Sequence, residues 1–170
     1  MNRGVKFIYI LFISLFLSIF LNASDVDYEL DKSSALAKKE HKHLMLFLHK
    51  NHCGYCEGMF LHLDEEALAK PIKKNFILLD INRDEDDERV SYQDFEGTNR
   101  EFLKELGVDF YPAMAFIDGN NKIIFGVVGY RTPEKILTVL NYVSSESYKS
   151  MSLEEFRDEE DFFKDDEDDE

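Results

Sequence analysis

Short apolar runs separated by polar segments dominate the chain after its first two dozen residues. Four runs have the length and composition of buried strands: 44–49, 76–81, 112–118 and 122–128. The turn Gly119-Asn120-Asn121 separates the last two, so we expect them to form an antiparallel hairpin.

The segments between these runs place apolar residues at helical spacing. Helices are expected at about 33–42, 53–70, 98–106 and 132–143. Pro71 should perturb the end of the second, and Gly107 should stop the third. Pro133 occupies a favourable first helical position in the fourth.

The segment 82–98 is polar and acidic but contains Val90, Tyr92 and Phe95, so we interpret it as an inserted excursion with a small hairpin. The resulting order is α-β-α-β-α-β-β-α. Helical crossovers between parallel strands followed by a hairpin predict an α/β fold, with a mixed central sheet and helices on both faces.

The first residues have the organisation of a secretory signal peptide. Arg3 and Lys6 precede an uncharged apolar run of 15 residues, 7–21, and Ala23 offers a small residue for cleavage. We therefore expect a signal peptide at 1–23 and a periplasmic protein. An uncleaved membrane anchor fits less well, because a spanning helix needs about 20 apolar residues.

Residues 24–147 are long enough for one domain with a core, and 148–170 form an acidic C-terminal tail. Residues 154–170 hold 12 acidic and 2 basic side chains, and the whole chain has a formal net charge of -15, which argues against a nucleic-acid partner. The tail is expected to be a solvated extension. Its alternative is a docked helix, because 152–155 is a capping box and Leu153, Phe156 and Phe163 could share one face.

The only two cysteines are the candidate reactive residues, and they form the motif Cys53-Gly54-Tyr55-Cys56. The motif follows an apolar strand and opens a helical segment. A crosslink between cysteines so close in sequence closes too small a loop to stabilise a fold, so a redox role is the better interpretation. Cys53 should lie at the positive end of the helix and attack, while Cys56, one turn inside, resolves the mixed disulfide.

This arrangement resembles the thioredoxin superfamily over about 33–143. The matching pieces are 47–49 before the cysteines, Gly107-Val108-Asp109-Phe110-Tyr111-Pro112, and Gly129-Tyr130-Arg131 before the last helix. More narrowly, the leading helix and the extra segment before the proline resemble the secreted, single-domain SoxW-type proteins.

The resemblance implies that Pro112 is cis and faces the cysteines, and that the backbone of Tyr111 pairs with an extended substrate segment. The alternative for Pro112 is an ordinary trans proline at the start of a strand. Phe47 stands where thioredoxin has a buried aspartate, so the usual proton acceptor for Cys56 is missing.

Three neighbours of the cysteines are expected to modulate the site. Tyr55 either contacts substrates or covers the helix start. Glu57 should oppose a thiolate by about 0.5 to 2 kcal/mol at roughly 8 Å, or simply favour its own helix. His52, when protonated, would stabilise the thiolate, unless it is a plain exposed loop residue.

We therefore expect a periplasmic thiol-disulfide oxidoreductase without a cofactor, acting on protein disulfides as a reductase. The resemblance implies a membrane electron donor of the thioredoxin-coupled type. The sequence contains no added dimerisation domain, which favours a reductase over an isomerase. Two alternatives stay open: a metal carrier using Cys53, Cys56, His49 and His52, and a non-catalytic interaction module.

Overall fold

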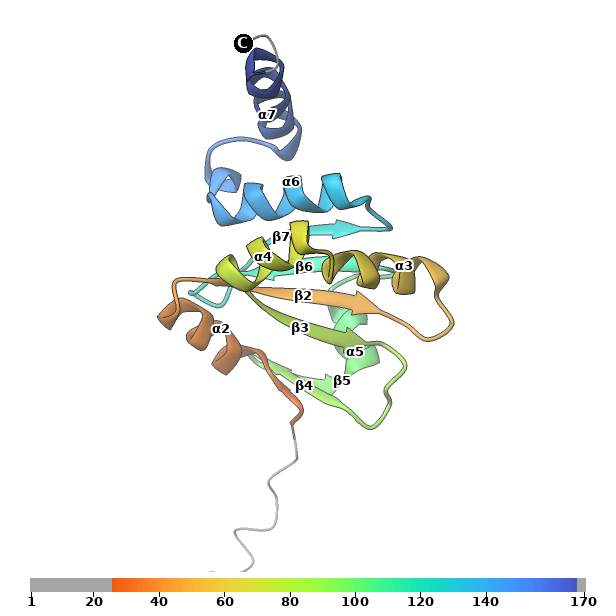
Figure 1. Ribbon diagram of the computed structural model, residues 1–170. Helices are drawn as coiled ribbons and strands as arrows, with labels where there is room; N and C mark the ends of the chain where they lie inside the picture. Colours follow the sequence, from red (N-terminus) through yellow and green to blue (C-terminus); the bar gives the residue numbers. More distant parts are fainter. Residues whose placement is uncertain (1–25, 168–170) are drawn as a thin grey trace, which may run out of the picture.

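The computed structural model describes residues 26–167, with side chains up to residue 161, so the expected signal peptide at 1–23 lies outside the described residues. A four-stranded sheet forms the centre of the molecule (Figure 1). Its strands, in spatial order, are β3 (Phe76–Asn82), β2 (His43–His49), β6 (Ala113–Ile117) and β7 (Ile123–Val128). β2 and β3 are parallel, and the other two pairings are antiparallel. The α/β fold with a mixed sheet is confirmed.

The alternation of side chains along β2 divides the core in two. Met45 and Phe47 point to one face, where they join a cluster that includes Met59, Phe116 and Ile136. The residues Leu44, Leu46 and Leu48 point to the other face, against Leu30, Ile81, Phe102 and Leu103. Because both faces are covered, the strand is apolar from Leu44 to Leu48, as the sequence pattern indicated.

Helices cover both faces of the sheet. The first cluster packs under α3 (Gly54–Leu63), α4 (Glu66–Asn75) and α6 (Pro133–Ser144). The second packs under α2 (Leu30–Lys39) and α5 (Asn99–Glu105). Thr98 caps α5 through a capping box with Glu101.

The single helix expected at 53–70 is two helices. α3 ends at Leu63, and Glu65 adopts an extended conformation before α4 begins. The break lets Leu63 and Leu68 both pack into the first cluster. Pro71 lies inside α4, in its second turn, rather than ending it.

The expected hairpin in 82–98 is present as β4 (Arg89–Tyr92) and β5 (Phe95–Thr98). It belongs to a second, three-stranded sheet, in which the two-residue β1 (Tyr28–Glu29) pairs in parallel with β4. β1 is too short to leave a periodic signal in the sequence. The hairpin and α2 lie on the same side of the central sheet (Figure 1).

The C-terminal segment differs from a plain solvated extension. It contains the short helix η2 (Ser147–Lys149) and α7 (Leu153–Glu167), which follow α6 in the chain (Figure 1). Ser152 and Glu155 form the expected capping box, and Leu153 and Phe156 pack against the first core cluster. The side chain of Phe163 lies outside the described residues. Between residues 26 and 167, no helix is long and apolar enough to cross a membrane.

Candidate active site

The two cysteines lie where β2 leads through a short loop into α3. Cys53 is the N-cap of α3 and forms a disulfide with Cys56, with the Cα atoms 5.2 Å apart. Cys53 is 9% exposed and Cys56 is 3% exposed. The expected difference in exposure therefore exists but is small in the oxidised protein.

The helix terminus surrounds Cys53 with donors. The backbone N–H of Cys56 donates to Cys53 Sγ at 3.2 Å, and the N–H groups of Cys56 and Glu57 donate to the Cys53 carbonyl. The Cys56 N–H, together with the helix dipole, stabilises negative charge on the Cys53 sulfur when the disulfide is reduced. This geometry supports Cys53 as the attacking thiol.

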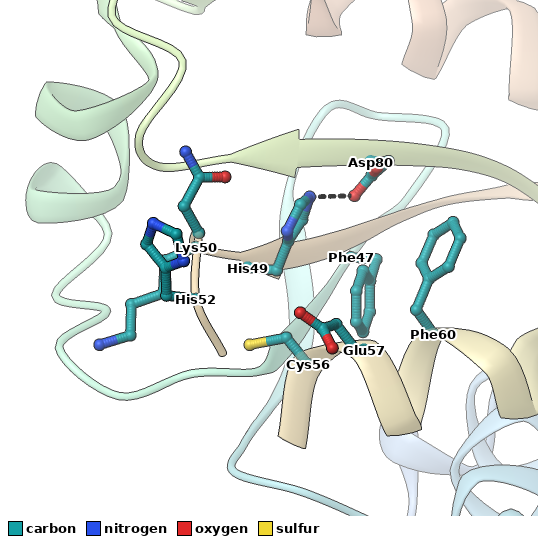
Figure 2. A pocket seen from close by; sticks show the side chains of 9 residues that line it. Phe47, His49, Lys50, His52, Cys56, Glu57, Phe60 and Asp80 are labelled. Atoms are coloured by element: carbon teal, nitrogen blue, oxygen red, sulfur yellow. Dashed lines mark ion pairs between the residues drawn. The ribbon is translucent and has the colours of Figure 1, made fainter. Parts of the chain in front are cut away.

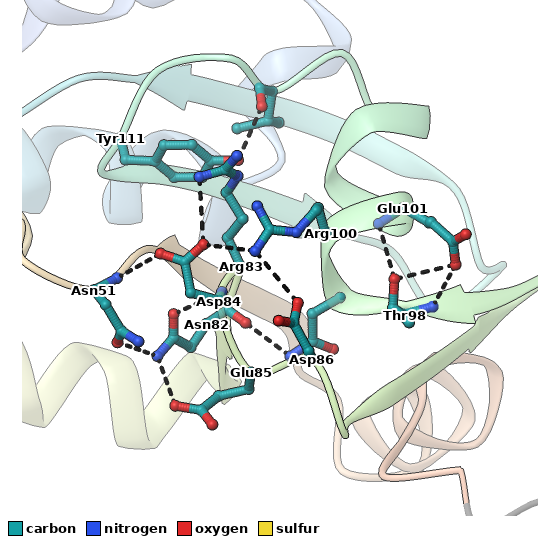
Figure 3. A network of polar contacts seen from close by, with 12 residues as sticks. Asn51, Asn82, Arg83, Asp84, Glu85, Asp86, Thr98, Arg100, Glu101 and Tyr111 are labelled. Atoms are coloured by element: carbon teal, nitrogen blue, oxygen red, sulfur yellow. Dashed lines mark hydrogen bonds and ion pairs between the residues drawn. The ribbon is translucent and has the colours of Figure 1, made fainter.

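A polar network fixes the loop that carries the cysteines, and sequence reasoning missed it (Figure 3). The backbone N–H of Asn51 donates to Asp84 Oδ2 at 3.1 Å, and Asn82 Nδ2 donates to Asn51 Oδ1 at 2.9 Å. His52 follows with a φ of 54°, in the left-handed region, and its side chain is exposed. No short motif signals this network, because it joins residues about 30 positions apart.

A cavity of about 240 Å³ lies beside Cys56 (Figure 2). Its lining consists of Phe47, His49, Lys50, Asn51, His52, Cys56, Glu57, Phe60 and Asp80. The rings of Phe47 and Phe60 form an apolar wall, with centroids 5.5 Å apart. His49 Nε2 lies 2.7 Å from Asp80 Oδ1 on the neighbouring strand, an ion pair when the imidazole is protonated.

Tyr55 belongs to an aromatic surface on the other side of the helix start. Its side chain is 71% exposed, and its ring lies 5.8 Å from that of Tyr130. The Tyr130 hydroxyl lies 2.8 Å from His62 Nε2, which holds this ring in place. Tyr55 is thus available to a second molecule, as the expectation of substrate contact requires.

Tyr111 and Pro112 lie at the start of β6, and their connecting peptide bond is cis. Ala113 pairs with Leu48 on β2, so the proline enters the sheet beside the strand that leads to the cysteines. The Pro112 carbonyl accepts a hydrogen bond from the Gly129 N–H at 2.7 Å. The Tyr111 hydroxyl donates to the Val108 carbonyl at 3.0 Å, and burial raises the pKa of this phenol.

A cationic cleft of about 490 Å³ borders Tyr111, and the sequence did not reveal it. The cleft is lined by Lys50, Arg83, Arg100, Lys104, Val108, Asp109 and Tyr111. Arg83 and Arg100 both pair with Asp84, at 3.3 and 3.0 Å (Figure 3). Lys50 lines both this cleft and the cavity beside Cys56, so the two hollows adjoin. Four of the seven lining residues are cationic, but Arg100 also pairs with Asp86 at 3.3 Å, so the paired carboxylates and Asp109 offset much of this charge.

The histidines do not complete a metal site with the cysteines. His49 contacts Asp80, and both sulfurs are used in the disulfide. Within the described part of the chain, no three His, Cys, Asp or Glu side chains are grouped so as to hold a metal ion.

Solved structures similar to this one support the fold. A thioredoxin-fold protein from Helicobacter pylori has a TM-score of 0.59 and 21% identity, covering 68% of this chain and 82% of its own. A thioredoxin from Thermus thermophilus has a TM-score of 0.54 and 19% identity, covering 68% and 84%. No curated protein matches the sequence.

The sequence profile of the thioredoxin-like domain family matches residues 30–144, which include every strand of the central sheet, both cysteines and Pro112. The fold, the position of the disulfide at the N-terminus of α3 and the proline at the start of β6 agree with this match. The chain therefore belongs to the family of thioredoxin-like domains.

Proposed function

We propose that this protein is a periplasmic thiol-disulfide oxidoreductase that reduces disulfides in client proteins. The observation that carries the proposal is the position of Cys53, which caps α3, receives the Cys56 N–H on its sulfur and is already bonded to Cys56. In the reduced protein, the Cys53 thiolate attacks a client disulfide. Cys56 then attacks Cys53, so the client gains two electrons and the protein returns to the oxidised state.

The reducing direction is favoured by the charges around the site. Strongly oxidising dithiols owe their high potential to a stabilised thiolate. Here Glu57, in the first turn of α3, partly offsets the helix dipole, and Asp80 adds a second carboxylate to the cavity beside Cys56, against one lysine, Lys50. A thiolate that its surroundings stabilise less makes the dithiol a better electron donor. Such a protein needs a source of electrons, for which we propose a membrane donor of the thioredoxin-coupled type.

Two features support a relationship with the secreted SoxW type within this proposal. α2 precedes the first strand of the central sheet, and the β4–β5 hairpin is inserted between β3 and α5. These are the leading helix and the extra segment on which the resemblance rests.

The decisive experiment is the redox potential of the Cys53–Cys56 couple, measured by equilibration with glutathione, together with reduction of insulin. We expect a potential near that of thioredoxin, about -270 mV, and insulin reduction when an electron donor is supplied. A potential near -120 mV would indicate an oxidant instead. No insulin reduction, with a protein that remains folded, would favour the interaction module.

A further inference from the structure

The Cys56 thiol of the reduced protein needs a proton acceptor. It must become a thiolate to attack Cys53 and release the client. Cys56 is 3% exposed, so protons must leave it through the adjoining cavity. Phe47, on the cavity wall, has no group that could take the proton.

Five ionisable side chains line this cavity: His49, Lys50, His52, Glu57 and Asp80. All except His49 are exposed residues, and the side chain of His49 is only 21% exposed. His49 lies two positions after Phe47 on β2, so both face the same side of the sheet. In Figure 2, the His49–Asp80 pair lies across the cavity from the Cys56 sulfur.

Asp80 and Phe47 hold the His49 ring in position. The Asp80 carboxylate lies 2.7 Å from Nε2, and the Phe47 ring stacks 5.7 Å from the imidazole. The contact with Asp80 is an ion pair when the imidazole is protonated, and it does not have hydrogen-bond geometry. The second ring nitrogen, Nδ1, can accept a proton whenever it carries none. Figure 2 shows this second nitrogen on the side of the ring away from Asp80.

We propose that His49, oriented by Asp80, accepts the proton of Cys56 across the cavity, through a bridging water molecule. The Cys56 S–H bond breaks, the proton passes to Nδ1, and the new thiolate forms the Cys53–Cys56 bond while the bond from Cys53 to the client breaks. The imidazolium then returns the proton to the departing client thiolate. Asp80 is a positioning residue, and its charge stabilises the imidazolium. This inference adds a proton acceptor to the proposed function. The part of it that concerns protein clients rests on that proposed function.

The test measures the reaction of each cysteine separately, by stopped-flow mixing of the reduced protein with dithiodipyridine. Attack by Cys53 releases the first coloured thiopyridone, and attack by Cys56 releases the second. We expect His49→Gln to slow the second release about 100-fold at pH 7, the low end of the effect typical of a lost general base, and to leave the first within about twofold. The pH dependence of the second release should differ between the wild type and the variant, because only the wild type has a titratable side chain at this position.

Asp80→Asn provides a second variant in case His49→Gln is unstable. It should slow the second release about 3- to 10-fold, because the imidazole loses the carboxylate that positions it. His41→Gln is the matched control, since it changes an exposed histidine that precedes β2, at the end of the strand away from the cysteines, and should leave the second release unchanged. A wild-type rate and pH profile in His49→Gln, or an equal loss in His41→Gln, would overturn the proposal.

These experiments can reject the role of His49 without rejecting the proposed function, and can reject the proposed function without rejecting the role of His49. Dithiodipyridine requires no client recognition, so the second release reports only on the dithiol. If insulin is not reduced but the second release depends on His49, the proposed function fails and the proton transfer stands. If insulin is reduced normally by His49→Gln, with an unchanged pH profile, the proton transfer fails and the proposed function stands.

Discussion

The ring of Phe156 on α7 packs against the ring of Tyr142 on α6, with their centroids 5.5 Å apart. The Tyr142 hydroxyl donates to the Met151 carbonyl at 2.7 Å, and Asn141 donates to Glu160 at 3.0 Å. These contacts attach the first turns of α7 to the domain despite its many acidic residues.

We therefore expect Phe156→Ala to lower the free energy of unfolding by about 1 to 3 kcal/mol, less than for a fully buried phenylalanine, because this side chain is only partly buried. Urea unfolding measures the loss. Removal of residues 162–170, beyond the last of these contacts, is the control and should cost little. Equal stability of Phe156→Ala and the wild type would mean that α7 does not dock in solution.

The two cysteines should react at different rates in the reduced protein. Cys53 caps α3 and is the more exposed of the pair, so alkylation at neutral pH should modify it much faster than Cys56. Mass spectrometry of partly alkylated protein measures the two rates. Comparable rates would contradict the assigned roles.

Serine variants test the same roles through clients. Cys53→Ser should abolish turnover. Cys56→Ser should accumulate mixed disulfides, because attack proceeds and resolution does not. Non-reducing gels of the Cys56→Ser protein with oxidised insulin reveal these species, and their absence in Cys53→Ser is the control. A Cys56→Ser protein that captures no insulin would argue against exchange at this site.

The cationic cleft should select clients by charge. Lys104 is an exposed residue of α5 at the edge of the cleft, so Lys104→Glu should slow association with peptides that carry acidic residues beside their disulfide. We expect a loss of about three- to tenfold at low ionic strength, declining as salt is added. Stopped-flow kinetics with acidic and neutral peptides of equal length measure it.

Lys74→Glu makes the same change of net charge on the exposed surface of α4 and serves as the control for Lys104→Glu. If both variants slow the acidic peptide equally, the effect belongs to the total charge of the protein rather than to the cleft.

His43 should make stability depend on pH. Burial lowers its pKa from the ordinary 6.5, with Lys149 acting in the same direction and Glu146 and Asp118 opposing it. The unfolded chain therefore binds a proton more readily than the folded protein. Stability is then lost as the pH falls through about 6.5 towards the lower folded value. Unfolding free energies at pH 5 and pH 7 should differ more in the wild type than in His43→Gln, and identical differences would exclude this contribution.

Much of the fold could be predicted from local pattern. The four strands of the central sheet, the hairpin at 82–98 and the cap of α5 at Thr98 follow from periodicity and turn chemistry among neighbouring residues. The cysteine motif at the start of α3 follows in the same way, because the change from strand to helix is visible in the sequence.

Other boundaries depended on packing. The break between α3 and α4 at Asp64 and Glu65 has no glycine or proline to mark it, and it serves to bring Leu63 and Leu68 into one core. The acidic composition of the tail indicated solvation, but Leu153 and Phe156 within it pack against the core of the domain. Burial of a few side chains outweighs average composition when a matching surface exists.

The sequence by itself determined the fold class, the cysteine pair and the residues beside it, because these depend on order and spacing along the chain. Only the tertiary structure placed His49 against Asp80 and gathered the cations around Tyr111. For the His49–Asp80 pair, the reason is the register of β2 and β3, which sets Phe47 opposite Asp80 and His49 opposite Asn82. Contacts between residues about 30 positions apart arise from that pairing, and no local pattern of apolar and polar residues specifies them.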